Sequence, residues 1–158
     1  IMGSTAINGP RRIGKSSLAN FVYNHCKVNF DDIEAVWIDC QNINTITLDG
    51  FFKEIQKNSS LSYISGKSKE ECLSNFVVAI RSSSKKTAIF IDEFELLTDI
   101  GHKQQFDENF YLQLRMLGQE GKFVMVLVSK EPLREICKHV LGVASPFYNI
   151  LIILYNFI

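Results

Sequence analysis

The sequence has 158 residues, of which 46% are hydrophobic and 22% are charged, as in an ordinary globular domain that builds its own core. Lysine plus arginine and aspartate plus glutamate number 17 each. The chain as a whole therefore has no basic field that would attract nucleic acid, and a local basic patch is the alternative that stays open.

The cysteines and the two ends of the chain indicate a cytoplasmic protein without a membrane partner. None of the cysteines forms a C-x-x-C pair or a zinc-type spacing with a histidine, so we interpret them as reduced, packed thiols. The start has no signal-peptide pattern. The apolar end, residues 148–158, is shorter than the about 20 residues of a membrane helix. We expect one domain over 1–158 and, because the chain starts on a strand and stops in an apolar run, a fragment of a longer protein.

The first part of the chain predicts two strands, two helices and a polar loop. Strands are expected over 2–8 and 34–39, where short apolar runs occur, and helices over 15–27 and 48–58, where apolar residues recur at helical spacing. These positions are Leu18, Phe21, Val22 and Cys26 in the first helix and Leu48, Phe51, Phe52 and Ile55 in the second. Residues 58–67 are serine-rich and polar, which indicates a loop.

Three further helices are predicted downstream. Ser68 and Glu71 form a capping-box pattern that opens the first of them. The second covers 104–117, and Pro132 suits the first turn of a short third helix. Their apolar positions are Leu73, Phe76, Val77 and Ile80, then Phe106, Phe110, Leu114 and Leu117, then Leu133, Ile136, Cys137 and Val140.

Three more apolar runs predict strands, over 87–92, 122–129 and 149–155. Continuous apolar strands that alternate with amphipathic helices indicate an α/β protein with a parallel sheet of about five strands covered on both faces. Sheets of this type bind ligands at the carboxyl ends of their strands. The residues directly after each strand are therefore the candidates for function.

The loop after the first strand reads GPRRIGKS over residues 9–16, which matches the phosphate-binding pattern G-x-x-x-x-G-K-S. Its glycines let backbone N–H groups turn toward an anion, and the following helix starts there with its positive end. Lys15 is expected to reach the β- and γ-phosphates and Ser16 to bind Mg²⁺. The other interpretation is a glycine turn without a ligand. The expected nucleotide-binding residues are Gly9, Pro10, Arg11, Arg12, Ile13, Gly14, Lys15, Ser16 and Ser17.

The third predicted strand, AIFI, leads directly into Asp92 and Glu93. A buried strand that ends in paired acids is a Walker B arrangement, in which Asp92 holds Mg²⁺ and Glu93 orients or deprotonates the attacking water. The alternative is that both acids only cap the helix that follows. Lys15 and Asp92 lie 77 positions apart, which leaves room for a strand and two helices between them.

Glu93 favours an ATPase that activates water with a carboxylate, and the absence of a guanine-reading N-K-x-D pattern favours ATP over GTP. In this class a further strand lies between the phosphate-loop strand and the Walker B strand, which gives the order 5-1-4-3-2. The strand over 122–129 is the candidate for that place. Ser129 at its end would then sense the γ-phosphate by hydrogen bonding, unless it only caps the next helix.

Other polar residues at the same edge allow two interpretations each. Asp39 and Gln41 either position Glu93 and its water or form a turn. Arg115 either reaches the nucleotide of a neighbouring subunit, as arginine fingers do, or is a solvated helix charge. Arg11 and Arg12 either pair with an acid or a partner subunit, or are solvated at the crest of the loop.

With these residues in view, the chain resembles the prokaryotic STAND ATPases, the signal-transduction branch of the AAA+-like P-loop proteins. It is most similar to their AAA-like group and to archaeal ATPase domains. The stretches that carry the resemblance are GPRRIGKSSL at 9–18, WIDCQN at 37–42, IFIDEFELL at 89–97, LRML at 114–117, VLVSKEPL at 126–133 and SPFYNI at 145–150.

The resemblance implies a switch in signalling or defence that binds ATP with Mg²⁺, forms a homo-oligomer and resets on hydrolysis to ADP. It also implies sensor and effector domains on the same chain. Relative to that family, the sequence lacks the segment before the first strand that helps to hold adenine, and the lid and winged-helix parts at the end. Two alternatives remain: a DNA-linked AAA+-like ATPase that helps transposition or replication, and a nucleotide-binding scaffold without turnover. Flanking sequence would separate them.

Overall fold

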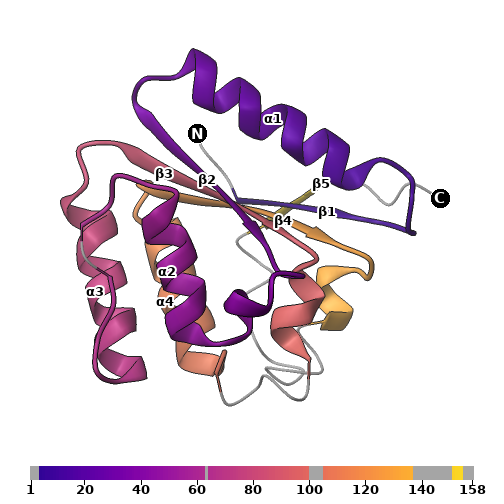
Figure 1. Ribbon diagram of the computed structural model, residues 1–158. Coiled ribbons are helices and arrows are strands. Elements are labelled where there is room, and N and C mark those ends of the chain that lie inside the picture. Colours follow the sequence, from indigo (N-terminus) through magenta and orange to yellow (C-terminus); the bar gives the residue numbers. More distant parts are fainter. Residues whose placement is uncertain (1–3, 63, 100–104, 137–150, 155–158) are drawn as a thin grey trace.

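The computed structural model describes residues 4–62, 64–99, 105–136 and 151–154. Strands alternate with helices along the chain, as Figure 1 shows. The strands are β1 (Ser4–Asn8), β2 (Ile33–Asp39), β3 (Lys86–Asp92), β4 (Phe123–Ser129) and β5 (Leu151–Leu154). The α-helices are α1 (Lys15–Asn29), α2 (Leu48–Lys57), α3 (Lys69–Ser82) and α4 (Glu108–Gln119), and the short 3₁₀ helices are η1 (Ile43–Ile46) and η2 (Phe94–Thr98).

The strands form one parallel sheet in the order β2-β3-β4-β1-β5. The predicted α/β parallel sheet is therefore confirmed, and the order read from the β5 edge is 5-1-4-3-2. β4 lies between β1 and β3, with Asn8 paired to Ser129, and β2 pairs with β3 so that Asp39 stands beside Asp92. The register thus aligns the carboxyl ends of the four strands that the sequence marked for function.

The two faces of the sheet are covered unequally. α1 crosses one face, and α2, α3 and α4 pack together on the other (Figure 1). Strand alternation separates the two sets of side chains, because successive residues point to opposite faces. On β3, for example, Ile89 and Ile91 belong to the large core under α2 to α4, whereas Ala88 and Phe90 belong to the core under α1.

The predicted apolar faces of α2 and α3 are confirmed. All eight positions are buried: Leu48, Phe51, Phe52, Ile55, Leu73, Phe76, Val77 and Ile80. Phe52 lies at the centre of an aromatic cluster, with its ring centroid 4.9 Å from that of Phe76 and 5.8 Å from that of Phe51. The capping box of α3 is confirmed only in half. Ser68 Oγ accepts from the Glu71 N–H at 3.2 Å, but the Glu71 carboxylate accepts from the Lys67 N–H at 2.7 Å.

The predicted start of the helix over 104–117 is wrong. α4 begins at Glu108, because the carboxylate of Asp107 accepts from the Phe110 N–H at 3.1 Å and caps the helix there. Phe106 is fully buried as expected, yet it precedes the helix. In the last predicted helix, residues 133–136 are helical and Leu133 and Ile136 are buried, whereas 137–140 lie outside the described residues.

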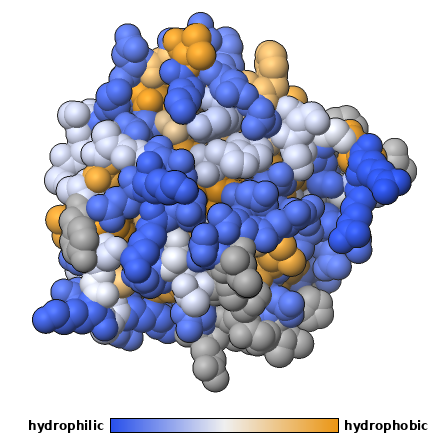
Figure 2. All heavy atoms as spheres, viewed as in Figure 1, coloured by the Kyte–Doolittle hydropathy of each residue, from blue (hydrophilic) through white to orange (hydrophobic). Residues whose placement is uncertain are grey.

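α1 is helical as predicted, but three of the four positions of its predicted apolar stripe do not face the sheet, whereas Cys26 is half-buried against the core under α1. Phe21 is 71% exposed, Leu18 44% and Val22 38%, and apolar side chains reach the surface over α1 (Figure 2). The helix packs through Ala19, which is fully buried against Ile7 and Val128, and through Tyr23, whose ring centroid lies 5.6 Å from that of Phe90. The small alanine lets the helix backbone approach the strands closely.

Three cysteines, Cys26, Cys40 and Cys72, are free thiols, and Cys137 lies outside the described residues. Within the part of the chain that the structure describes, no helix is both long and apolar enough to cross a bilayer.

Phe52 and Phe21 give a matched pair for the packing of the two faces. Phe52→Ala removes a fully buried ring, so we expect it to lower the free energy of unfolding by about 3–5 kcal/mol. Phe21→Ala removes an exposed ring and should change it by about 0.5 kcal/mol or less. Urea denaturation measures both. A large loss for Phe21→Ala would mean that the outer side of α1 is packed against another part of the protein.

Candidate functional site

The loop between β1 and α1 turns the backbone through unusual conformations. Gly9 has a φ of 148°, Gly14 of 93° and Arg12 of 64°. Positive φ values are easy for glycine and costly for arginine. Gly14 is the N-cap residue of α1 and provides no side-chain cap, so the first N–H groups of the helix are available to a ligand. An uncapped helix start with turned backbone before it is a ready site for an anion.

A cavity of about 460 Å³ opens above this loop, a volume within the usual range for small-molecule sites. Residues from four separate segments line it, which confirms that the strand ends converge. The lining residues are Arg11, Arg12, Gly14, Lys15, Ser16, Ser17, Gln41, Glu93 and Lys130. Gly9, Pro10 and Ile13 belong to the same loop but are not among them.

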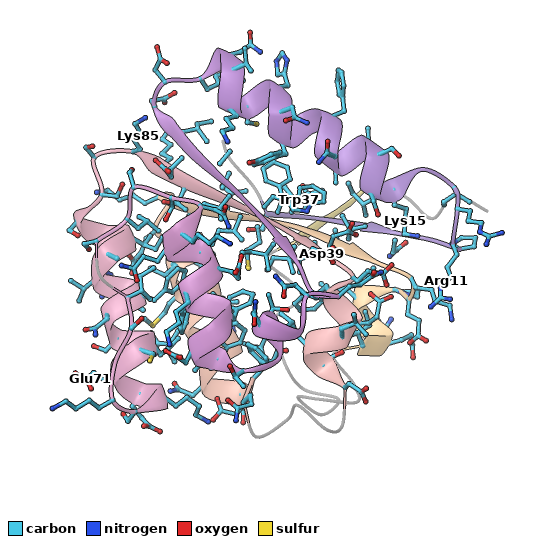
Figure 3. The ribbon with its side chains drawn as sticks, viewed as in Figure 1. Arg11, Lys15, Trp37, Asp39, Glu71 and Lys85 are labelled. Carbon is cyan, nitrogen blue, oxygen red and sulfur yellow. The ribbon has the colours of Figure 1, made fainter. Side chains whose placement is uncertain are left out.

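Cations dominate the lining of this cavity. Arg11 and Lys15 lie where β1 leads into α1, and Arg11 projects outward from the loop (Figure 3). The Lys15 ammonium donates to the Pro10 carbonyl at 2.8 Å and so folds back over its own loop. Neither Arg11 nor Arg12 forms an ion pair with another described residue. The arrangement suits a polyanionic ligand.

Ser16 and Asp92 lie together although they are 76 positions apart in the sequence, and the Ser16 hydroxyl donates to Asp92 Oδ1 at 3.0 Å. A hydroxyl and a carboxylate are hard oxygen donors of the kind that Mg²⁺ prefers. Among the described residues, no group of three or more acidic, histidine or cysteine side chains could hold a metal ion alone. A cation at Ser16 and Asp92 would therefore take its other oxygens from water and from the ligand.

Burial raises the pKa of the Asp92 carboxyl above its ordinary value. The hydrogen bonds from the Ser16 hydroxyl and the Glu93 N–H act in the opposite direction, and the neighbouring charges of Glu93 and Asp39 add to the increase. A carboxylate that is held partly desolvated beside other acids is destabilised until a cation compensates it. The electrostatics at this point therefore favour binding of a cation.

Glu93 has a left-handed backbone, with a φ of 53°, a conformation that costs a non-glycine residue about 1–3 kcal/mol and that clusters at functional sites. Its N–H donates to Asp92 Oδ1 at 3.0 Å. It stands at the N-cap position of η2, but its side chain makes no capping hydrogen bond and instead lines the cavity. The alternative of a mere helix cap is thus not supported for Glu93.

The end of β4 differs from the expectation. Ser129 is buried, and its hydroxyl donates to the Glu131 carbonyl at 2.7 Å. This bond is not that of a helix cap, in which the side-chain oxygen accepts from a backbone N–H, and the γ-phosphate contact stays a prediction. The next residue, Lys130, lines the cavity instead. Sequence reasoning missed Lys130 as a site residue. The signal was present, since it is a cation directly after a strand that points to the site.

The remaining candidate residues differ in whether they lie at the cavity. Gln41 lines the cavity, and its N–H donates to Asp39 Oδ1 at 2.9 Å, which is the predicted turn. Asp39 lies in an adjoining groove with Ser16, Asp92 and other residues. Arg115 is in α4 on the opposite face and does not line the cavity. Its buried Nε has no hydrogen-bond partner among the described residues, and its role toward a neighbouring subunit stays a prediction.

Comparison of the sequence with known protein families gives one match. The family model described as "AAA domain" matches residues 2–137, which is most of the chain. Among curated proteins, none matches significantly.

Solved structures share the fold at low sequence identity. The ORC2 protein of Aeropyrum pernix in ADPNP-ADP complexes matches with a TM-score of 0.73 and 13% identity over 99% of this chain and 42% of that chain. The ORC1 protein of the same organism in complex with DNA matches with a TM-score of 0.70 and 13% identity, over 97% of this chain and 39% of that chain. PCH-2 of C. elegans matches with a TM-score of 0.54 and 14% identity, over 96% of this chain and 34% of that chain. At such identities the likeness shows the fold alone, and this chain spans about two fifths of the ORC proteins.

The raised pKa of Asp92 predicts a stability change with pH. The folded protein binds the Asp92 proton more tightly than the unfolded chain does, so the free energy of unfolding falls as pH rises from the unfolded pKa through the folded one. Asp92→Asn keeps an acceptor oxygen and removes the charge. We expect this variant to be more stable than the parent at neutral pH, and the two to converge below about pH 3.9.

Urea denaturation at several pH values measures this difference, with Asp31→Asn at an exposed carboxyl as the control. A difference between Asp92→Asn and the parent that stays constant with pH would contradict the assignment of desolvation at Asp92.

Proposed function

The chain belongs to the AAA domain family, and we propose that it binds ATP together with Mg²⁺ and hydrolyses it. The observation that carries this proposal is the convergence of two motifs in one place. The G-x-x-x-x-G-K-S loop and Glu93 line the same cavity, and Ser16 of that loop is hydrogen-bonded to Asp92.

The loop and its cations would bind the phosphates. The free N–H groups at the start of α1 and the Lys15 ammonium present positive charge to the cavity. Lys15 now donates to the Pro10 carbonyl, a weak neutral acceptor that a phosphate oxygen would replace with a stronger, charge-assisted bond. The same loop thus supplies both the backbone N–H groups and the lysine ammonium that would bind a triphosphate.

Ser16 and Asp92 would hold the Mg²⁺, because they place a hydroxyl and a desolvated carboxylate together. The ion would supply charge neutralisation of the phosphate oxygens. Glu93 lines the cavity next to Asp92 in the sequence, and its side chain makes no helix-capping hydrogen bond. Its carboxylate would accept a proton from the attacking water as a general base, and the fixed left-handed backbone holds it in place for that step.

For the biological setting of the ATPase, the sequence favours a STAND switch and offers the DNA-linked class as the alternative, but the comparisons favour the DNA-linked class. Two of the structures with the same fold are ORC proteins, and one of them is described in complex with DNA. No comparison supports the STAND setting, with its sensor and effector domains. Assembly into a homo-oligomer and binding of DNA by this chain both remain proposals for the full-length protein.

Two variants test the ATPase proposal in one experiment. Lys15→Ala removes the phosphate donor, so we expect ATP binding and hydrolysis both to be lost. Glu93→Gln keeps the size of the side chain and removes the base. We expect it to retain ATP binding and to lower the turnover number by about 100-fold or more.

Isothermal titration calorimetry and phosphate release measure binding and turnover. Lys27→Ala, at the far end of α1 and outside the cavity lining, is the matched control and should behave as the parent. Turnover by Glu93→Gln equal to that of the parent would remove Glu93 from catalysis. Binding by the parent without turnover would favour the nucleotide-binding scaffold instead.

A further inference from the structure

We propose that Arg12 is a second catalytic residue of this site, and that its guanidinium stabilises the negative charge that develops on the phosphate oxygens while ATP is hydrolysed. The inference rests on the proposed ATPase function and adds one residue to it. It starts from the backbone conformation of Arg12 and from its place in the cavity.

Arg12 and Glu93 share an unusual backbone. Among the described residues, they are the two non-glycine residues with a positive φ, 64° for Arg12 and 53° for Glu93. Both line the same cavity, although they lie far apart in the sequence. Backbone strain of this kind persists only where the surrounding structure holds it, and it clusters at active sites. The shared strain therefore points to a function for Arg12 in the same site as the proposed base.

Glycine would fit the turn at Arg12 better than arginine does. The other two positive φ values of the loop belong to Gly9 and Gly14, which adopt them without steric cost. An arginine at the third place makes the folded loop less stable than glycine would. A side chain kept at such a place is expected to act on a ligand rather than on the fold.

The Arg12 side chain is not engaged in the fold. It is exposed and forms no ion pair with another described residue. Arg81 shows the contrast, because its guanidinium donates two hydrogen bonds to the Glu120 carboxylate. Arg12 thus keeps its planar set of donors free, and this set matches the spacing of phosphate oxygens.

The two strained residues come from different sides of the cavity. Arg12 belongs to the loop that follows β1, Glu93 follows β3, and β4 lies between those strands. A phosphate that is attacked by a water on Glu93 would therefore lie between the two. The N–H groups at the start of α1 and the Lys15 ammonium would bind the resting phosphates, which leaves the Arg12 guanidinium available for the charge that develops during the reaction.

This charge follows from the reaction itself. The water oxygen bonds to the terminal phosphorus, and Glu93 takes the proton of the water. The bond from that phosphorus to the bridging oxygen breaks, and ADP leaves with the electron pair. A guanidinium that donates to these oxygens stabilises the transition state. Because Arg12 and the loop belong to the same chain, hydrolysis then requires no cation from a second copy.

The test compares Arg12→Gly with the parent as the whole chain. Glycine suits the φ of 64°, so we expect the variant to resist urea at least as well as the parent. We expect its turnover number to fall by about 100-fold, the effect of one lost transition-state donor. Its affinity for a non-hydrolysable ATP analogue with Mg²⁺, measured by calorimetry, should fall by less than about fivefold, as for an exposed charge pair.

Two further variants separate the charge from the loop. Arg12→Lys keeps a cation in the strained turn and should lose less turnover than Arg12→Gly. Arg134→Ala is the matched control, because Arg134 is an exposed arginine outside the cavity lining, and it should behave as the parent. The turnover number of the parent should be the same at low and at high protein concentration.

Three outcomes overturn the inference. Unchanged turnover in Arg12→Gly would remove Arg12 from catalysis. A loss of analogue affinity as large as the loss of turnover would make Arg12 a contact to the resting phosphates. A turnover number of the parent that rises with protein concentration would assign the stabilising cation to a second copy.

Failure of the inference can be distinguished from failure of the proposed function. If the parent hydrolyses ATP and Glu93→Gln does not, while Arg12→Gly keeps full turnover, the proposed function stands and the inference alone fails. If the parent does not hydrolyse ATP, both fail together.

Discussion

The candidate site depends on one constraint, the parallel direction of all the strands. Because the strands run the same way, their carboxyl ends meet at one edge of the sheet. The order then decides which ends are neighbours. With β4 between β1 and β3, the phosphate-type loop, the Lys130 segment and the paired acids stand side by side. Residues far apart in the sequence, such as Ser16 and Asp92, come within hydrogen-bond distance as a consequence.

The two faces of the sheet contribute differently to this arrangement. The large core under α2, α3 and α4 is rich in phenylalanine rings and holds β2, β3 and β4 in place. α1 packs on the other face through Ala19 and through Tyr23 and Cys26, and residues at its N-terminus line the cavity. The site thus joins the end of β3, which leads into Asp92 and Glu93, to the start of the helix on the other face, which carries Lys15 and Ser16.

Much of this could be predicted from local patterns. The phosphate-type loop has fixed spacing, the Walker B pair follows an unbroken apolar run, and the stripes of α2 and α3 have a clear helical period. Patterns of this kind depend on neighbours in the sequence, which is why they could be read without a structure. The start of α4 was misplaced because Phe106 continues the apolar spacing, although Asp107 caps the helix after it.

The features that were missed depend on three-dimensional packing and on backbone conformation. The orientation of α1 follows from the packing of Ala19, Tyr23 and Cys26 on the sheet, which the apolar period of the helix does not reveal. The choice between Ser129 and Lys130 depends on the bond from the Ser129 hydroxyl to Glu131 and on the bond from Lys130 to Glu95. The left-handed backbone of Glu93 has no sequence signature at all.

The central claim, that the loop and the Walker B acids form one Mg²⁺-nucleotide site, is tested most directly by a crystal structure with a non-hydrolysable ATP analogue and Mn²⁺ in place of Mg²⁺. The account predicts an anomalous peak within coordination distance of Ser16 Oγ and on the side of Asp92, with the Lys15 ammonium moved from the Pro10 carbonyl to a phosphate oxygen. A nucleotide bound elsewhere, with the bond from Lys15 to Pro10 intact, would contradict it.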